Sequence, residues 1–432
     1  MADDRKIDSI SSLPDVILQH ILSSIPTKLA VTTSLLSKRW RHVWCDTPCL
    51  SLDIDRRATA VSIKETLTRY TAPNVSNFHL KTTMGRSVTH MEMWIKFAIS
   101  HNVENLSLDL CTPYDRYNNE KYAYPDFSFI NSSVCWTSLK KLSLCDCCLS
   151  DESLAKILSG CPLLQSLTLS CCDELMVVDL SKSLHLTTLK INRDVCFTGP
   201  KQIVAPHIHR LKMLFNYKSP CLLVDVSFLV EANLGICYSP MPYTEHADFF
   251  QEMVLKMLEK LQNAEKLTFG ENILQILSLA QIRGVPSPML KVKDLTLETN
   301  IDQYVIPGVE RVLQNSPHLK KLTVHTMHNS TIQGSLLDKY LMKKGLSSDM
   351  CWRSKDGVIW NKNASDIVSK HVTSFLELML KNTKALEKIV VQLDNDYLKF
   401  QEVVTGLAHN NNVPILLSPS VKTIDEWFNT GY

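Results

Sequence analysis

The chain has 432 residues, 45% of them hydrophobic, which is enough for a substantial core and for two or three domains. Its 46 Lys and Arg residues nearly balance 44 Asp and Glu residues, and a net charge of +2 excludes a strong general attraction to nucleic acid or to an anionic membrane. The polar start MADDRKIDSI lacks a signal-peptide pattern, and no stretch approaches the ~20 apolar residues of a membrane span. These features predict a protein of the nucleus or the cytoplasm, with its 14 cysteines reduced.

Residues 10–50 contain two apolar helical patterns in immediate succession. The first consists of Leu13, Ile17, Leu18, Ile21, Leu22 and Ile25, and the second of Leu29, Val31, Leu35, Leu36, Trp40, Val43 and Trp44. Pro14 and Asp15 predict the start of the first helix, and Thr27 is the predicted N-cap of the next one. A segment of roughly 40 residues cannot bury this much apolar surface alone. It therefore folds against the rest of the chain or docks on another protein.

The same segment resembles the plant-type F-box, whose pattern is LPD, ILS, LPTK, AV-TS, LSKRW and a closing W. The matching residues are Leu13–Asp15, Ile21–Ser23, Pro26–Lys28, Ala30–Val31, Thr33–Ser34, Leu36–Trp40 and Trp44. The small departure is Ile25, where Leu is usual, and this near-isosteric exchange should cost little.

The resemblance implies that residues 8–50 bind a Skp1-like adaptor, which links proteins of this kind to a cullin. It assigns one part of the adaptor contact to Leu13, Pro14, Ile17, Leu18, Ile21, Leu22 and Ile25. The residues that complete the module, some of them as core, are Val31, Leu36, Trp40 and Trp44.

A second pattern, L-x-x-L-x-L, recurs in the middle of the chain. Its copies are VENLSL (103–108), LKKLSL (139–144), LQSLTL (164–169), LTTLKI (186–191), IHRLKM (208–213), ANLGI (232–236), AEKLTF (264–269), VKDLTL (292–297) and LKKLTV (319–324). CLSL (49–52) and NFHL (77–80) resemble degenerate first copies. The marker leucines at 142, 167, 189, 211 and 234 are 22 to 25 residues apart, within the range of leucine-rich repeats. The later markers at 267, 295 and 322 have longer connectors.

Each copy predicts a short strand that buries alternate side chains, followed by a connector that returns the chain to a parallel neighbour. Helix signals occur in the connectors at 151–158, 250–261 and 309–313. Residues 51–325 are therefore expected to form a curved solenoid of leucine-rich repeats, whose concave sheet is a long binding surface.

The repeat pattern stops near His325. Residues 326–370 are polar and weakly periodic, which predicts an irregular insertion. A helix is predicted by the spacing of Val372, Phe375, Leu376, Met379 and Leu380, and a strand over 385–394. The run FLELMLKNTKALEKIVVQL (375–393) resembles the end of the FBD domain of plant F-box proteins. Residues 371–432 are interpreted as an FBD-like α/β cap on the solenoid.

Motifs for chemistry are absent from the sequence. It has no GxSxG, Walker, GxGxxG or HExxH motif, and its clustered cysteines lack paired CxxC spacing. The cluster, interpreted as structural thiols, comprises Cys145, Cys147, Cys148, Cys161, Cys171 and Cys172. No metal, cofactor or catalytic residue is expected. The aromatic-rich stretch 111–130 is either a packed loop or a recognition element.

The expected architecture is α/β: a small helical F-box, a solenoid of leucine-rich repeats and a capping segment. The resemblance implies a non-catalytic substrate-recognition subunit of an SCF-type (Skp1–cullin–F-box) ubiquitin ligase that holds an unidentified target protein. Two alternatives stay open: a binding scaffold without a ligase role, and a small-molecule receptor of the hormone F-box type. The receptor is the weaker alternative, because the hormone F-box receptors carry a basic inositol-phosphate site and this sequence shows no comparable Lys/Arg cluster.

Overall fold

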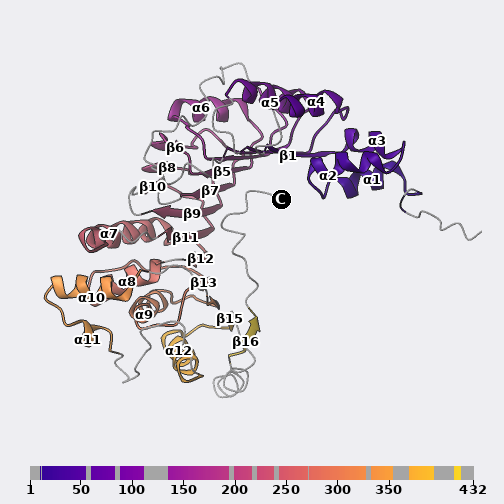
Figure 1. Ribbon diagram of the computed structural model, residues 1–432. Coiled ribbons are helices and arrows are strands. Elements are labelled where there is room, and N and C mark those ends of the chain that lie inside the picture. The colour runs from indigo at the N-terminus through magenta and orange to yellow at the C-terminus, as the bar shows by residue number, and fades with distance from the viewer. Residues whose placement is uncertain are drawn as a thin grey trace, which may run out of the picture. The chain divides into compact units, whose positions relative to one another are not determined.

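The computed structural model describes residues 10, 12–54, 60–82, 88–110, 135–193, 199–216, 221–237, 243–270, 272–326, 332–353, 369–393 and 413–419. These residues divide into two units, the first up to Glu174 and the second from Leu175 onward. Figure 1 labels the helices and strands of both units. Among the described residues, no helix has the length and apolar content that crossing a bilayer requires.

The first unit begins with a helical module. Its elements are α1 (Asp15–Leu22), α2 (Thr27–Thr32), the 3-10 turn η1 (Thr33–Leu35), α3 (Trp40–Val43) and the 3-10 turn η2 (Trp44–Asp46). Pro14 and Pro26 occupy the N-cap positions of α1 and α2, and neither helix has a side-chain cap. The prediction that Thr27 caps the second helix is therefore wrong, because Thr27 is already the first helical residue.

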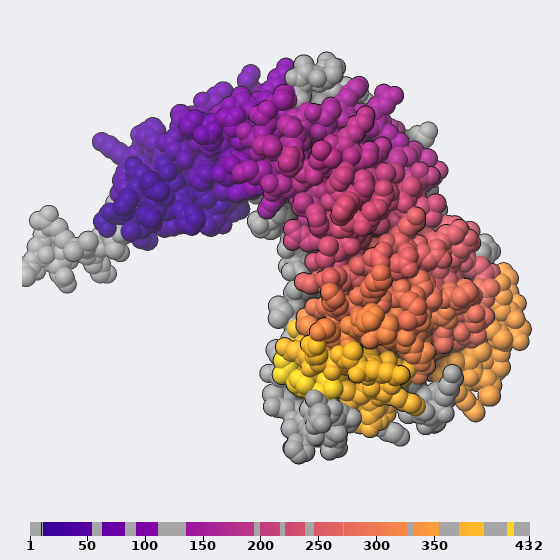
Figure 2. All heavy atoms as spheres, turned by 180° about the vertical axis from the view of Figure 1, so that it is seen from behind, coloured from indigo at the N-terminus to yellow at the C-terminus, as the bar shows by residue number. Residues whose placement is uncertain are grey.

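The Thr27 hydroxyl instead joins the helical module to the first strand, β1 (Cys49–Ile54). Its Oγ1 accepts a hydrogen bond from the Ser51 amide at 2.8 Å, on the edge of β1 that has no neighbouring strand in the described part of the chain. The Cys45 carbonyl accepts from the Thr71 and Ala72 amides at 2.9 and 3.2 Å. Figure 2 shows the indigo atoms of the module adjoining the violet atoms of the residues that follow it. The module thus forms one body with the start of the sheet.

Replacing Thr27 by valine is expected to destabilise the first unit by about 1–3 kcal/mol, because the Ser51 amide loses its acceptor at a part-buried site. Hydrogen exchange at the Ser51 amide should accelerate, and the thermal midpoint of the first unit should fall. Thr32→Val is the matched control, since the exposed Thr32 hydroxyl bonds only the Lys28 carbonyl of its own helix. Equal effects of the two variants would contradict a role for Thr27 at the strand edge.

The strands of the first unit run parallel in sequence order, with helices on one side of them (Figure 1). The elements that follow β1 are α4 (Ala60–Arg69), β2 (Asn77–Thr82), α5 (Val88–Ser100), β3 (Asn105–Asp109), β4 (Lys141–Cys145), α6 (Asp151–Gly160) and β5 (Ser166–Ser170). The pairing aligns one buried position per strand, in the order Leu50, Phe78, Leu106, Leu142 and Leu167. Both degenerate copies are confirmed as strands.

The second unit continues the same plan. Its main strands, in spatial order, are β7 (Thr188–Asn192), β9 (Arg210–Asn216), β11 (Glu231–Cys237), β12 (Lys266–Phe269), β13 (Asp294–Glu298), β14 (Lys321–His325), β15 (Lys388–Leu393) and β16 (Ile415–Pro419). The helices between them include α7 (Tyr243–Leu261), α8 (Ile273–Ile282), α9 (Ile306–Gln314) and α12 (Ser369–Asn382).

One repeat marker of the second unit was assigned incorrectly from sequence. Leu211 pairs with Ala232, which in turn pairs with Leu267, so Ala232 and not Leu234 is the equivalent position. A shift of two residues leaves a side chain on the same face of a strand, and the larger Leu234 is also buried. The error therefore changed the apparent repeat spacing but not the predicted face.

A separate small sheet lies beside the main strands of the second unit. It consists of β6 (Val177–Asp179), β8 (Gln202–Val204) and β10 (Leu222–Asp225), in the parallel order β10-β8-β6. In this part of the array the connectors are thus short strands instead of the helices expected from the repeat pattern.

The interval 326–370, expected to be irregular, contains α10 (Gly334–Lys343) and α11 (Ser348–Cys351). Helix α10 is held against α7 by a polar network centred on Asp248. The Tyr340 hydroxyl donates to Asp248 Oδ1 at 2.5 Å, and Lys344 Nζ lies 2.6 Å from Oδ2. The Arg283 guanidinium lies 2.5 Å from the same carboxylate. Tertiary contacts of this kind are not visible in the hydrophobic periodicity of the segment, which explains the missed helix.

Candidate functional site

The helical module distributes the eleven predicted adaptor-binding residues between core and surface. Four of them form its core: Leu18, Leu22, Trp40 and Trp44 are at most 6% exposed. Three are half-buried: Leu13, Ile25 and Val31. Four are exposed: Pro14, Ile17, Ile21 and Leu36. These four core residues are too buried to contact a partner directly. They can affect binding only by holding the exposed residues of the module in place.

Three further apolar side chains of the module are exposed and were not assigned to the adaptor contact from sequence. Val16 is 72% exposed, Leu29 54% and Leu35 86%. With Ile17, Ile21 and Leu36 they form what we call the exposed apolar set. A signal was present in the sequence, because Val16, Ile17 and Leu18 are consecutive and cannot all face one core from a helix.

An ion pair joins two parts of the F-box pattern that are distant in sequence. Arg39 Nε and Nη2 lie 2.9 and 2.6 Å from Asp15 Oδ1, and Nη2 also donates to the Leu13 carbonyl. Asp15 belongs to the LPD segment and Arg39 to LSKRW. Both side chains are substantially exposed, so the pair orients the start of α1 more than it stabilises the module.

In the cysteine cluster, Cys145 ends β4, Cys147 and Cys148 follow it, Cys161 follows α6, and Cys171 and Cys172 follow β5. Cys147 Sγ and Cys172 Sγ are 3.4 Å apart and buried, and their mutual hydrogen bond together with burial raises the pKa of the Cys172 thiol. Cys145 lies beside Asp109 and Asp146 in a group with donor atoms within 4.8 Å of one another. Burial raises the pKa of the Cys145 thiol, which opposes the thiolate form that metal binding requires.

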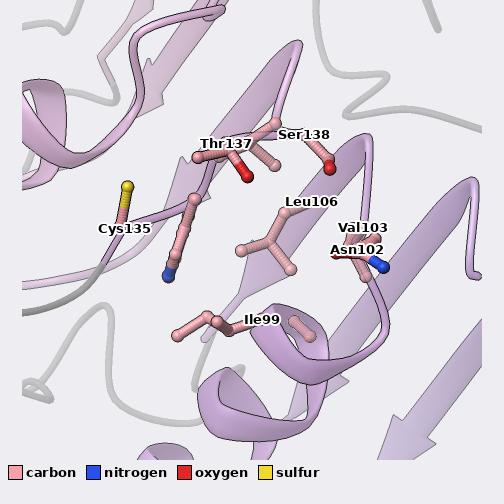
Figure 3. Close-up of a pocket in the computed structure, with 10 residues that line it drawn as sticks. Ile99, Asn102, Val103, Leu106, Cys135, Thr137 and Ser138 are labelled. Carbon is pink, nitrogen blue, oxygen red and sulfur yellow. The ribbon is translucent and has the colours of Figure 1, made fainter.

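A small cavity lies between the end of α5 and the segment before β4. Figure 3 shows residues that line it, among them Ile99, Val103 and Leu106 at the end of α5 and after it, and Cys135 and Thr137 before β4. Its volume of about 30 Å³ holds one or two water molecules and is far below that of a small-molecule site. The indole nitrogen of Trp136, which also lines it, has no hydrogen-bond partner among the described residues.

The strand residues that alternate with the buried positions form what we call the open face of the sheet, on the side away from the helices. In the first unit this face is polar. Asn105 Nδ2 donates to Asn77 Oδ1 at 2.7 Å, and Asn77 Nδ2 donates to Cys49 Sγ at 3.1 Å. In the next row, polar atoms of His79, Ser107 and Ser143 have no partner among the described residues. These three atoms are themselves buried, so they are not available to a bound chain in this arrangement.

The aromatic stretch 111–130, weighed as a recognition element, lies outside the described residues.

Comparison with known proteins identifies the family. An F-box domain model matches residues 10–52, and a model of the LRR repeats of the FBD-associated F-box protein At5g56370 matches residues 91–228. The F-box/LRR-repeat protein At3g18150 of Arabidopsis thaliana is 58% identical over 426 residues, which cover 95% of this chain and 92% of the relative. The chain belongs to the F-box/LRR-repeat proteins.

Other Arabidopsis thaliana members of the family align over a similar extent. The F-box/LRR-repeat protein At5g02910 is 48% identical over 453 residues, covering 98% of this chain and 97% of the relative. The F-box/LRR-repeat protein At3g03360 is 46% identical over 449 residues, covering 95% and 91%. The plant F-box/LRR resemblance is therefore confirmed, and the helical module α1–η2 lies within the F-box match.

Proposed function

We propose that this F-box/LRR protein is the substrate-recognition subunit of an SCF-type E3 ubiquitin ligase in the nucleus or cytoplasm. Its F-box binds a Skp1-like adaptor, through which it joins a cullin, and its repeats bind the target protein. F-box/LRR proteins typically are non-catalytic adaptors. The subunit contributes proximity, because a tethered target meets the ubiquitin-transferring enzyme at high effective concentration.

The observation that carries the proposal is the exposed apolar set of the F-box. Single exposed apolar residues are ordinary on protein surfaces, but here six occur between residues 16 and 36. Leu35 and Leu36 are adjacent and 86% and 70% exposed, although α2 and α3 on either side of them contribute buried residues. Apolar surface left exposed on a small folded module is typical of a protein-binding site. An adaptor with a complementary apolar groove would bury it.

The repeats supply the second part of the proposal. Parallel strands with helices on one side present their open face to a partner along many repeats. We infer that this array is a curved solenoid, that the target binds its open face, and that α12, β15 and β16 cap the last repeat. Val390 and Leu416, which are paired on the open face of β15 and β16, are exposed or half-buried.

The adaptor contact is tested with the triple variant Ile17→Ala/Leu35→Ala/Leu36→Ala. We expect its affinity for a purified Skp1-like adaptor to fall at least ~30-fold, since hot-spot truncations cost about 2 kcal/mol or more. Because all three side chains are exposed, the thermal midpoint should hardly change. Isothermal titration calorimetry and a thermal melt measure both quantities.

Leu184→Ala/Phe228→Ala is the matched control, because these repeat residues are 68% and 62% exposed but lie outside the F-box. It should bind the adaptor like the native chain. Native affinity in the F-box variant would exclude the exposed apolar set as the adaptor contact.

A further inference from the structure

Three basic side chains from two neighbouring strands meet on the open face of the second unit. Lys190 lies on β7, and Arg210 and Lys212 lie on β9. The register pairs Lys190 directly with Lys212 and Thr188 with Arg210, at strand spacings of roughly 4.8 Å. All three residues alternate with buried positions, so they share one face. We call these residues the basic patch.

Lys190 and Arg210 of the basic patch form no ion pair with another described residue. Arg210 Nε donates to the Thr188 hydroxyl at 3.3 Å, a contact that orients the guanidinium without neutralising it. The carboxylate nearest in register is that of Glu231 on β11, which pairs with Arg210. Like charges opposite each other, as at Lys190 and Lys212, weaken a strand pair.

The positive charge is local to this part of the protein. At the described open-face positions of the first unit, two basic residues balance two acidic ones: Lys81 and Lys141 against Asp53 and Asp109. The second unit has six basic and three acidic: Lys190, Arg210, Lys212, Lys266, Lys321 and Lys388 against Glu231, Asp294 and Glu298. Farther along the sheet the charges pair internally, with Lys321 Nζ 3.1 Å from Asp294 Oδ2. Strands β7 and β9 have no acidic residue within their bounds.

We propose that the basic patch binds an acidic segment of the target protein, one that carries carboxylate or phosphate groups. This inference rests on the proposed function, since it names the chemistry of the target that the repeats recognise. Lys190 and Arg210 are exposed and so accessible to a partner. An Arg guanidinium forms paired hydrogen bonds with carboxylate and phosphate, and adjacent lysines add charge without fixing geometry. Such a patch accelerates encounter with an acidic partner and excludes basic ones.

The probe for this proposal is a fluorescein-labelled octaglutamate peptide, with octaglutamine as its uncharged match. Fluorescence anisotropy with the full-length chain should show binding of octaglutamate alone, weakening as salt shortens the screening length. In Lys190→Glu/Arg210→Glu we expect the affinity to fall at least ~10-fold. The control Lys260→Glu/Lys339→Glu makes the same change in net charge at exposed positions of α7 and α10. Its affinity for octaglutamate should stay within about twofold of the native value.

The proposal would be overturned by no octaglutamate binding even at low salt, by equal weakening by both charge variants, or by tighter binding of a single-stranded oligonucleotide than of the peptide. Displacement of the peptide by inorganic pyrophosphate at concentrations equal in charge would likewise assign the patch to small anions. Titration of the charge variant with the Skp1-like adaptor separates this proposal from the proposed function. If the charge variant keeps adaptor binding and loses peptide binding, the result supports both this proposal and the proposed function.

Discussion

Replacing Gly308 by alanine is expected to destabilise the second unit by about 2–3 kcal/mol, although the same change inside a helix usually stabilises by up to about 1 kcal/mol. The thermal midpoint of that unit should fall by roughly 4–10 °C. Differential scanning calorimetry of the full-length chain measures the change.

The reason is the close approach of α9 to α8. A Cβ atom on Gly308 would overlap the Leu274 carbonyl oxygen and would lie 2.9 Å from Ser278 N and Oγ. The Gly308 amide donates to Ser278 Oγ at 2.8 Å, and that hydroxyl donates to the Leu274 carbonyl at 3.0 Å. The clash is with backbone atoms of a helix that is buried from Ile273 to Ala280, so no flexible side chain can yield. The helices must move apart and lose packing.

Gly345→Ala is the control for backbone strain. Gly345 has φ +74°, and a Cβ atom added there would meet no other atom within 4 Å. Alanine at this position should therefore cost about 1 kcal/mol from conformation alone. A Gly308→Ala variant as stable as the native chain, or no less stable than Gly345→Ala, would contradict the close helix contact.

Replacing Trp44 by alanine is expected to unfold the F-box. Trp44 is 4% exposed and lies in η2, which contacts both α1 and α2. Removing a buried tryptophan costs about 3–5 kcal/mol, a large part of what a module of this size can provide. Amide protons of residues 15–46 should exchange much faster, while those of α8 and α9 in the second unit keep their protection. Adaptor binding should be lost along with the fold.

Leu35→Ala is the matched comparison, because Leu35 is 86% exposed and its truncation should change stability by less than about 0.5 kcal/mol. It should weaken adaptor binding in a folded F-box. If Trp44→Ala left the exchange pattern of α1 and α2 native, the assignment of Trp44 to the core would be wrong.

The sequence predicted the repeating strands well because their signal is local and recurs. Each marker lies in a strand, and even the degenerate copies at Leu50 and Phe78 are in register with the others. The shift at Ala232 shows the limit of this signal, since a two-residue slip preserves the buried face. The short strands β6, β8 and β10 have three or four residues each, too few for a clear alternation.

The proposed binding surfaces were less predictable because they depend on contacts between distant residues. Leu18 and Val16 are both apolar, and only the packing of α1 shows that one is buried and the other exposed. The basic patch joins Lys190 to Arg210 and Lys212, which are twenty or more residues away in the sequence. No run of charged residues in the sequence therefore indicates the patch. Helix α10 was missed for the same reason, since its place is set by the contact of Tyr340 with Asp248.

The most direct test of the ligase role is the recovery of a cullin with the full-length chain. The native protein and Ile17→Ala/Leu35→Ala/Leu36→Ala are expressed in plant cells, purified by the same affinity tag and compared by quantitative mass spectrometry. A cullin and a Skp1-like adaptor should accompany the native chain, and both should be depleted together from the variant. Recovery of the adaptor without any cullin would contradict the ligase role and leave a scaffold that uses the adaptor alone.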